Sequence, residues 1–171
     1  VLELKKVFFD RAFHHPTRVL VQFNATEIEN YISSSVLPHD YKVNLRLYET
    51  EGTSGLTEEY KVAAYPLSQE WDEGVGKESD VPKTTDGCSW LYRKNREGAS
   101  EIEWTTPGGT YIAGDEVTQS FSSESPDINM DITTVAKKWF DGTNTNYGLL
   151  LRLSGSRETS SGSFEDIKFF S

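Results

Sequence analysis

The sequence predicts an all-β fold, an antiparallel two-sheet β-sandwich of jelly-roll type with one or two short helices. Many short apolar or alternating segments are separated by polar turns rich in Gly, Asp, Asn and Thr. Only two segments show helical spacing of apolar residues, and no internal repeat is present. We expect residues 1–171 to form a single domain. Because the first residue is Val1 rather than Met, the chain is expected to be a fragment of a slightly longer protein.

The first half of the chain contains the clearest alternation. From Tyr41 to Tyr48, Tyr41, Val43, Leu45 and Leu47 fall on one face, and polar residues fall on the other. His14-His15-Pro16 is expected to break the first strand, and residues 51–55 are expected to form a turn. The strands predicted here cover residues 1–11, 18–23, 41–48 and 60–66.

Two helices are predicted. Residues 25–35 place Ile28, Tyr31 and Ile32 at i, i+3, i+4 spacing. Residues 131–140 form the stronger prediction, with Asp131 as N-cap, Lys137 and Lys138 in the last turn, and Gly142 as the stop signal. Ile132, Val135, Ala136 and Trp139 line the apolar side of this helix.

The second half alternates a long loop with short strands. Residues 71–87 carry no periodicity and are rich in Gly, Asp and Pro, whereas Pro107-Gly108-Gly109 is a turn signal. In the last predicted strand, the apolar residues depart from strict alternation, which suggests a bulge. The strands predicted here cover residues 89–93, 117–122, 128–130, 149–153 and 164–170.

Composition limits the classes of function. Hydrophobic residues make up 36% of the chain, but 12% are aromatic, so a few large side chains must fill the core. The formal net charge of -10 would repel a phosphate backbone, and we therefore expect no nucleic-acid partner. No apolar run is long enough for a membrane helix, so no membrane insertion is expected. The single cysteine, Cys88, is expected to be a buried, inert thiol.

No cofactor is predicted, but calcium is an alternative that the acids leave open. Asp72, Glu73, Asp80 and Asp86 lie in one loop and could supply oxygen ligands. The spacing of a calcium-binding loop is missing, and we favour acids that form turns or face solvent. A pair of carboxylates for glycoside hydrolysis can be nominated in any acidic chain, so the acids do not indicate catalysis. The chain is predicted not to be an enzyme.

Aromatic residues near the glycine turn suggest a carbohydrate-binding surface. Flat rings pack against the faces of sugars, and the candidates are Tyr92, Trp104 and Tyr111. The alternative is that tryptophans serve as core residues. This reading is preferred for Trp71, Trp90 and Trp139, while for Trp104 the two readings are nearly balanced.

Several short motifs follow one another in a specific order. They are, in chain order, Arg18 to Phe23, Tyr41-x-x-Asn44-Leu45-x-Leu47-Tyr48, Tyr65-Pro66-x-Ser68-x-x-Trp71, Gly74-x-Gly76, Pro82, Gly87-x-Ser89-Trp90, Pro107-Gly108-Gly109, Asp127-Ile128-x-x-Asp131-Ile132-Thr133, Trp139, Asn146-Tyr147-Gly148, Ser154-Gly155-Ser156-Arg157 and Phe164-x-Asp166-Ile167-Lys168-Phe169-Phe170. In this order the motifs resemble those of the DNRLRE-type β-sandwich domains, and more closely those of virion structural proteins of large tailed bacteriophages. The resemblance covers nearly the whole chain, with Cys88 and the short acidic stretch 97–103 as departures.

This resemblance implies a jelly-roll domain on the exterior of a phage particle, as a fibre, neck, tail or head-decoration component. Its partners would be other virion proteins, with a host surface glycan as a further contact. Fibre components are often trimers, so a homotrimer is the expected assembly. The broader group includes carbohydrate-binding modules, and the alternative function is therefore such a module on a secreted or cell-surface protein. The resemblance supplies no catalytic residues.

Overall fold

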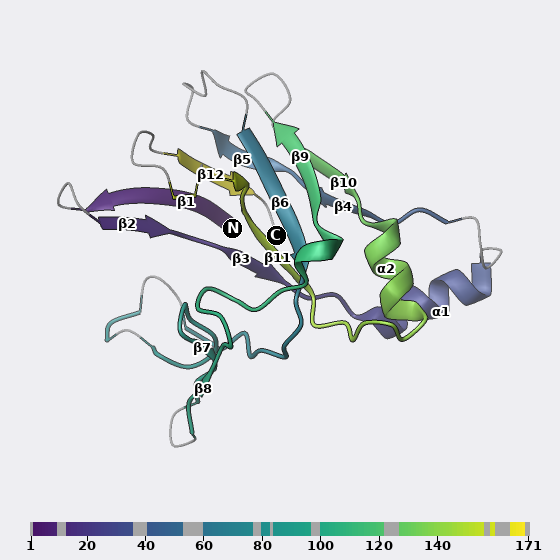
Figure 1. Cartoon of the computed structure of the whole chain (residues 1–171), viewed down its shortest axis with the longest axis horizontal. Helices are drawn as coiled ribbons and strands as arrows, with labels where there is room; N and C mark the ends of the chain where they lie inside the picture. The colour runs from purple at the N-terminus through teal and green to yellow at the C-terminus, as the bar shows by residue number, and fades with distance from the viewer. Residues whose placement is uncertain are drawn as a thin grey trace.

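The computed structural model describes residues 2–9, 13–35, 41–52, 60–76, 80–82, 84–96, 100–121, 127–155, 158–159 and 165–169. These residues are mostly β-strands in antiparallel sheets, with two α-helices and one turn of 3-10 helix, η1 (Ala113–Asp115) (Figure 1). The predicted all-β class is therefore confirmed. No helix among the described residues is both long and apolar enough to cross a membrane.

One four-stranded sheet brings the two ends of the chain together. It has the order β2 (Phe13–Pro16), β1 (Leu2–Phe9), β12 (Glu165–Phe169), β5 (Glu49–Gly52), and Leu2 pairs with Phe169. The predicted break at His14-His15-Pro16 is wrong, because these residues form β2 in register with β1. Glu51 and Gly52, predicted as a turn, belong to β5, whereas residues 53–55 lie outside the described residues. The bulge expected in the last strand is not found in β12, which pairs with β1 in continuous register; the register shift against β5 skips Thr50 of β5 instead.

A second four-stranded sheet forms the centre of the molecule. Its order is β3 (Val19–Val21), β11 (Leu149–Leu153), β6 (Tyr60–Pro66), β9 (Val117–Phe121), and the predicted bounds of β6 and β11 are confirmed. Leu149, Leu151 and Leu153 of β11 pack in the main core, while Leu150 packs in a separate cluster with Ala63 and Tyr65. The sheet is thus buried on both faces, which explains why β6 and β11 are apolar along nearly their whole length.

The main core draws on three sheets. Leu4 of β1 lies in the same buried cluster as Val62 of β6, and β4 (Asn44–Leu47) and β10 (Ile128–Asp131) contribute Leu45, Leu47, Ile128 and Met130. β4 and β10 pair with each other, and the side chain of Gln119 joins β9 to β10: its amide donates to the Asp127 carbonyl and its oxygen accepts the Asn129 N–H. The predicted alternation of β4 is confirmed by buried Leu45 and Leu47 beside exposed Asn44 and Arg46.

Both predicted helices are present, and they lie at the right of Figure 1, away from the long segment between β6 and β9. α1 (Ala25–Ser35) has the predicted bounds, and α2 (Thr133–Phe140) begins two residues later than predicted. The N-cap of α2 is Ile132 and not Asp131 as predicted, although the Asp131 carboxylate accepts the first N–H of α2, from Thr133 at 2.9 Å. Interaction with the Thr133 side chain, followed by this backbone hydrogen bond, lowers the pKa of Asp131. Gly142 follows the helix with φ +77°, as its predicted role as stop signal requires.

Candidate functional site

The segment from Leu67 to Tyr111 covers the outer face of the central sheet, and we call it the loop face. Its only strands among the described residues are β7 (Tyr92–Lys94) and β8 (Ile102–Glu103), which project as a small arm (Figure 1). β8 was not predicted, and β7 begins three residues later than the strand predicted over 89–93. A buried cluster of Ala63, Tyr65, Leu67, Trp104 and Leu150 holds the loop face on the sheet.

Two hydrogen bonds fix the start of the loop face to the segment before β11. The Leu67 N–H donates to the Gly148 carbonyl at 3.0 Å, and the Trp71 indole N–H donates to the Tyr147 carbonyl at 2.8 Å. Gly148 has φ +87°, and a β-carbon there would collide with the Val21 carbonyl oxygen. The Asn-Tyr-Gly motif is therefore required by the close approach of three chain segments.

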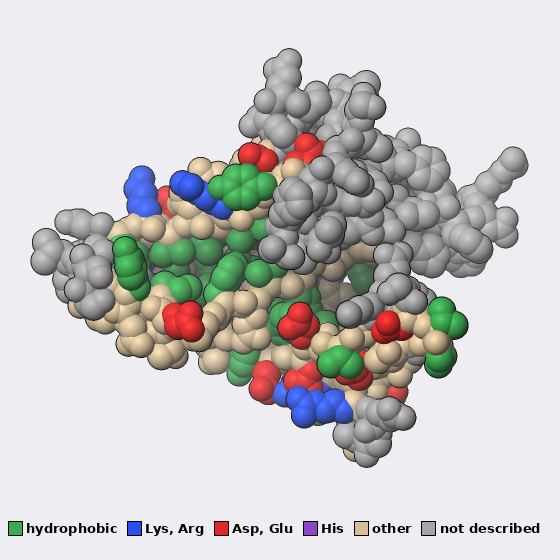
Figure 2. Space-filling view, turned by 180° about the vertical axis from the view of Figure 1, so that it is seen from behind, with side chains coloured by type: hydrophobic (Ala, Val, Ile, Leu, Met, Phe, Trp, Pro, Cys, Tyr) green, Lys and Arg blue, Asp and Glu red, His purple; other side chains and the backbone are tan. Residues whose placement is uncertain are grey.

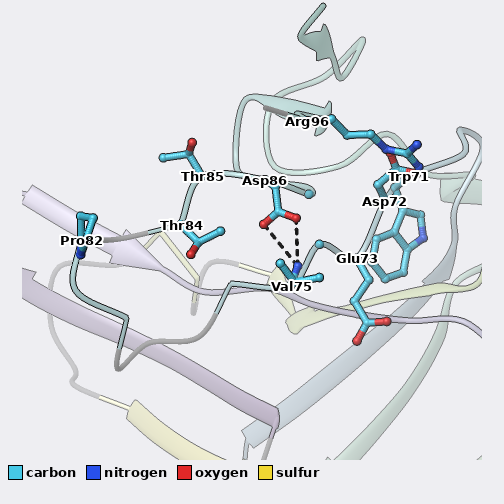
Figure 3. A pocket seen from close by; sticks show the side chains of 11 residues that line it. Trp71, Asp72, Glu73, Val75, Pro82, Thr84, Thr85, Asp86 and Arg96 are labelled. Atoms are coloured by element: carbon cyan, nitrogen blue, oxygen red, sulfur yellow. Dashed lines mark hydrogen bonds and ion pairs between the residues drawn. The ribbon is translucent and has the colours of Figure 1, made fainter. Parts of the chain in front are cut away.

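The loop face contains an open hollow with a volume of about 840 Å³ (Figure 3). Both oxygens of the Asp86 carboxylate lie within hydrogen-bonding distance of the Val75 N–H, at 3.2 and 3.1 Å, and hold the two sides of the loop together. The hollow is lined by Trp71, Asp72, Glu73, Gly74, Val75, Pro82, Thr84, Thr85, Asp86, Gly87 and Arg96. Hydroxyl, carboxylate and guanidinium groups next to an indole ring suit a polar ligand with many hydrogen-bonding groups.

Gly74 and Gly87 allow this loop to fold back on itself. Each has positive φ, and a β-carbon on Gly74 would lie 2.6 Å from the Asp86 carbonyl oxygen. A β-carbon on Gly87 would lie equally close, 2.6 Å, to the Cα of Gly74. The glycines and aspartates of this segment are thus required by the shape of the hollow.

The acids proposed for calcium do not converge. The Asp72 carboxylate pairs with Arg96 at 2.8 Å, Asp86 accepts the Val75 N–H, and Asp80 accepts the Thr84 hydroxyl at 3.1 Å. Glu73 lines the hollow beside them. Among the residues that the structure describes, no three His, Cys, Asp or Glu side chains gather closely enough to hold a metal ion. In the described structure, Asp72, Asp80 and Asp86 therefore bind other residues of the loop face.

The placement of Trp104 corrects one part of the predicted carbohydrate site. Only 4% of this residue is exposed, and its indole N–H donates to the Ser89 carbonyl at 3.0 Å. A ring packed in the cluster under the loop face cannot present a flat surface to a sugar. The reading of Trp104 as an exposed platform is therefore wrong, and the core reading applies.

The other two residues of the predicted site do not form one surface with Trp104. Tyr111 is half-buried in the same cluster, where its ring lies 4.3 Å from that of Tyr65. Tyr92 lies on the arm, and its hydroxyl bonds to Glu101, which raises the pKa of Tyr92. Each of the two rings thus has its own structural contacts, and carbohydrate binding by Tyr92 or Tyr111 stays a prediction.

The exposed tryptophan of this face is Trp90, which was predicted to lie in the core. It is 42% exposed, and the Arg18 guanidinium stacks on its ring at 4.7 Å. A β-carbon on Gly108 would lie within 3.0 Å of both Arg18 and Trp90. The turn signal at Pro107-Gly108-Gly109 therefore reflects the close packing of Gly108 against Arg18 and Trp90, although the sequence did not reveal these two partners.

Cys88 packs, half-buried, against the buried cluster of the loop face, and burial raises the pKa of its thiol.

A buried charge network lies beneath Trp90. Glu158, 3% exposed, accepts hydrogen bonds from Arg18 and pairs with Arg152 at 2.7 Å. Arg152 also donates to the Tyr111 hydroxyl at 3.3 Å, while Tyr65, next to Tyr111, bonds to Glu116. Burial, followed by this bond to Glu116, raises the pKa of Tyr65 to about 12. The network was not predicted, because nothing in the sequence indicates that residues 18, 152 and 158 meet.

No family model matches the chain, and no match is found among the curated proteins or the solved structures.

Proposed function

We propose that the chain is a non-enzymatic structural protein of a tailed-bacteriophage virion, folded as a jelly-roll β-sandwich. Its place would be the exterior of the particle, as a fibre, neck, tail or head-decoration component. Its work would be attachment to other virion proteins, with contact to a host surface as a further role.

The observation that carries this proposal is the structural role of the motifs through which the chain resembles virion proteins. Trp71, Tyr147 and Gly148 join the loop face to the central sheet, and Gly74 and Gly87 shape the loop. The Asp131 carboxylate accepts the first N–H of α2. In the described part of the chain, these residues make internal contacts that suit a scaffold, so the resemblance concerns the framework.

The surface charge and the expected assembly agree with this role. A net charge of -10 keeps a displayed domain soluble at high local concentration. A homotrimer is proposed by analogy with fibre components. Light scattering of the purified chain tests the assembly separately: a mass of three chains supports a trimer, and a mass of one chain contradicts it.

Particle proteomics tests the proposal. Phage particles purified on a density gradient would be digested, and the peptides of this chain would be quantified against those of the major capsid protein. We expect a constant copy number that is a multiple of the symmetry order at one site on the particle. Absence from washed, infectious particles would contradict the proposal.

A second function, a carbohydrate-binding module, is favoured by the hollow of the loop face. The hollow offers the Arg96 guanidinium, the Thr84 and Thr85 hydroxyls and the ring of Trp71 to one ligand (Figure 3). The exposed ring of Trp90 provides a surface of the type that packs against sugars.

A glycan array tests this second function. If it is correct, the purified chain binds a defined set of glycans, and Arg96→Ala or Trp90→Ala weakens binding at least about tenfold, a loss typical of one well-placed contact. Tyr48→Ala is the matched control, because Tyr48 is an exposed aromatic (53%) between β4 and β5, outside the loop face. Binding that all three variants retain would contradict a glycan site on this face.

A further inference from the structure

The strand β4 has one free edge in the described structure. It pairs with β10 on one side, and no described strand pairs with its other side. The Val43 carbonyl accepts the Ile132 N–H at 2.8 Å, and the Val43 N–H donates to the Thr133 hydroxyl at 2.9 Å, so the backbone groups of Val43 face the β10 side. Because backbone groups alternate along a strand, those of Asn44 and Arg46 face the free edge.

An open cavity with a volume of about 310 Å³ runs along this free edge. It touches Asn44, Leu45 and Arg46, three successive residues whose side chains alternate between the two faces of β4. One cavity can meet all three residues only along an edge of the strand, and the edge toward β10 is already paired. The cavity therefore lies where a further strand would pair with β4.

The wall opposite β4 is apolar. It comes from the residues after β3 and from the two helices, and its side chains include Phe23, Ile28 and Phe140. Figure 2 shows hydrophobic side chains lying open in a furrow, in the half of the molecule that carries the helices. An occupant of the cavity must therefore offer backbone groups to β4 and apolar side chains to this wall. An extended peptide offers both at once.

The outer face of β4 is basic beside the free edge. Arg46 is exposed, lies opposite the neutral Asn129 of β10, and has no ion-pair partner among the described residues. Lys42 is exposed at the spacing that places it on the same face. The acid paired with β4, Asp131, lies on the β10 side, away from the free edge. A strand added at this edge would lie directly beside Arg46, whose charge favours acidic side chains on the outer face of that strand.

We propose that the free edge of β4 binds an extended segment of a partner protein, in which apolar residues alternate with Glu or Asp. The segment would add as an antiparallel strand, because every strand pair in the described structure is antiparallel. Its apolar side chains would enter the cavity, and its acidic side chains would lie on the outer face beside Arg46. The inference does not depend on the proposed function.

Synthetic peptides test the charge preference. The probe is a capped peptide of alternating valine and glutamate, about seven residues long, which is within the usual length of a strand. The comparison peptide carries lysine in place of each glutamate. We expect the purified chain to bind the glutamate peptide at least about tenfold more tightly, because each like charge beside Arg46 opposes pairing.

Amide hydrogen exchange of the ¹⁵N-labelled chain shows where the peptide binds. In the complex, the N–H groups of Asn44 and Arg46 should become protected, since they gain acceptors on the added strand. The N–H groups of Leu45 and Leu47 face β10 and serve as the internal control, so their exchange should change little.

Methylated peptides separate strand pairing from general apolar contact. In the antiparallel arrangement, the glutamates lie opposite Asn44 and Arg46 and point their N–H groups at β4, whereas the valine N–H groups face away from β4. Methylation of the glutamate nitrogens should therefore weaken binding at least about tenfold. Methylation of the valine nitrogens should leave the affinity within about threefold.

A charge reversal on the chain completes the test. Arg46→Glu should make the chain prefer the lysine peptide. Lys61→Glu is the matched control, because Lys61 is an exposed cation on β6 of the central sheet, and it should leave the preference unchanged. Thermal unfolding checks that both variants fold. If Arg46→Glu does not fold, the methylated peptides decide with the unaltered chain.

Three results would overturn the proposal: no binding of the glutamate peptide, no protection of Asn44 and Arg46 in the complex, or equal affinities of the two methylated peptides. An oligomer of the chain that the glutamate peptide dissociates would also overturn it, since a second copy would then occupy the edge.

Discussion

The Arg18 guanidinium forms two parallel hydrogen bonds with the Glu158 carboxylate, Nε to Oε1 at 2.8 Å and Nη2 to Oε2 at 2.9 Å. Arg18 lies directly before β3, and Glu158 follows β11, so the pair joins the ends of neighbouring strands. The third nitrogen of Arg18 donates to the Gly108 carbonyl at 2.7 Å. One side chain thereby connects the central sheet, the C-terminal segment and the loop face.

Glu158→Gln should therefore destabilise the protein strongly. The side chains of Arg18 and Arg152 are only 12% and 15% exposed, and the substitution leaves both without their anionic partner. We expect the free energy of unfolding to fall by about 3 kcal/mol, as measured by urea denaturation. Glu70→Gln is the matched control: Glu70 pairs with Lys94 but is 61% exposed, so its loss should be below about 1 kcal/mol. Equal losses in the two variants would contradict the role of Glu158.

Tyr65 should make the protein lose stability in alkaline solution. Its pKa is raised from 10.0 to about 12, so the folded state holds the phenolic proton more tightly than the unfolded state. The associated stability is complete below pH 10 and is lost as pH rises from 10 toward 12. Tyr65→Phe should reduce this loss, by an amount on the order of 2 kcal/mol at most. Denaturation curves at several pH values compare the two proteins, and parallel curves would rule out a contribution from Tyr65.

Gly148→Ala should be far more harmful than Gly142→Ala. Both glycines have positive φ, which costs a non-glycine residue about 1–2 kcal/mol. At Gly142 a β-carbon would have no atom within 4 Å, whereas at Gly148 it would collide with the backbone at Val21 and Gln22. We expect about 1 kcal/mol for Gly142→Ala and at least about 3 kcal/mol for Gly148→Ala, by thermal or urea unfolding. Similar values would mean that the segments before β11 and after β3 are not in close contact.

Trp104, for which the core and surface readings were nearly balanced, should contribute more to stability than Trp90, which was predicted to lie in the core. Trp104→Ala removes a buried ring and should cost about 3–5 kcal/mol of unfolding free energy. Trp90→Ala removes a partly exposed ring and its contact with Arg18, and should cost about 1 kcal/mol. Acrylamide should quench the fluorescence of the Trp90 ring preferentially. A Trp90→Ala variant less stable than Trp104→Ala would contradict the placement of the two rings.

The strands of the central sheet and both helices could be predicted because local patterns determine them. β6 and β11 are apolar except for one basic residue each, and residues 25–35 and 133–140 repeat apolar residues at helical spacing. The strand β2 was missed because His14-His15-Pro16 contains a proline, which has no backbone N–H to donate to a neighbouring strand. Pro16 is the last residue of β2, and the strand pairs with β1 without a hydrogen bond from that position. Tertiary pairing prevailed over the local signal there.

The sites were harder to predict, because they depend on contacts between distant residues. The sequence neighbours of Trp90 and Trp104 do not reveal which ring is buried, because the packing of the loop face on Leu67 and Leu150 decides it. Arg18 and Glu158 are separated by 140 residues, so no spacing could indicate their ion pair. Gly74, Gly87, Gly108 and Gly148 were informative, since each marks a close approach, but a glycine does not identify the group that approaches.

Labelling of intact particles tests the central claim most directly. An antibody raised against the purified chain, and gold-labelled for electron microscopy, would be applied to particles of the phage that carries its gene. A virion structural protein on the particle exterior should be labelled at one fixed place on nearly every particle. Gold that stays on free protein and leaves intact particles unlabelled would contradict the proposed function.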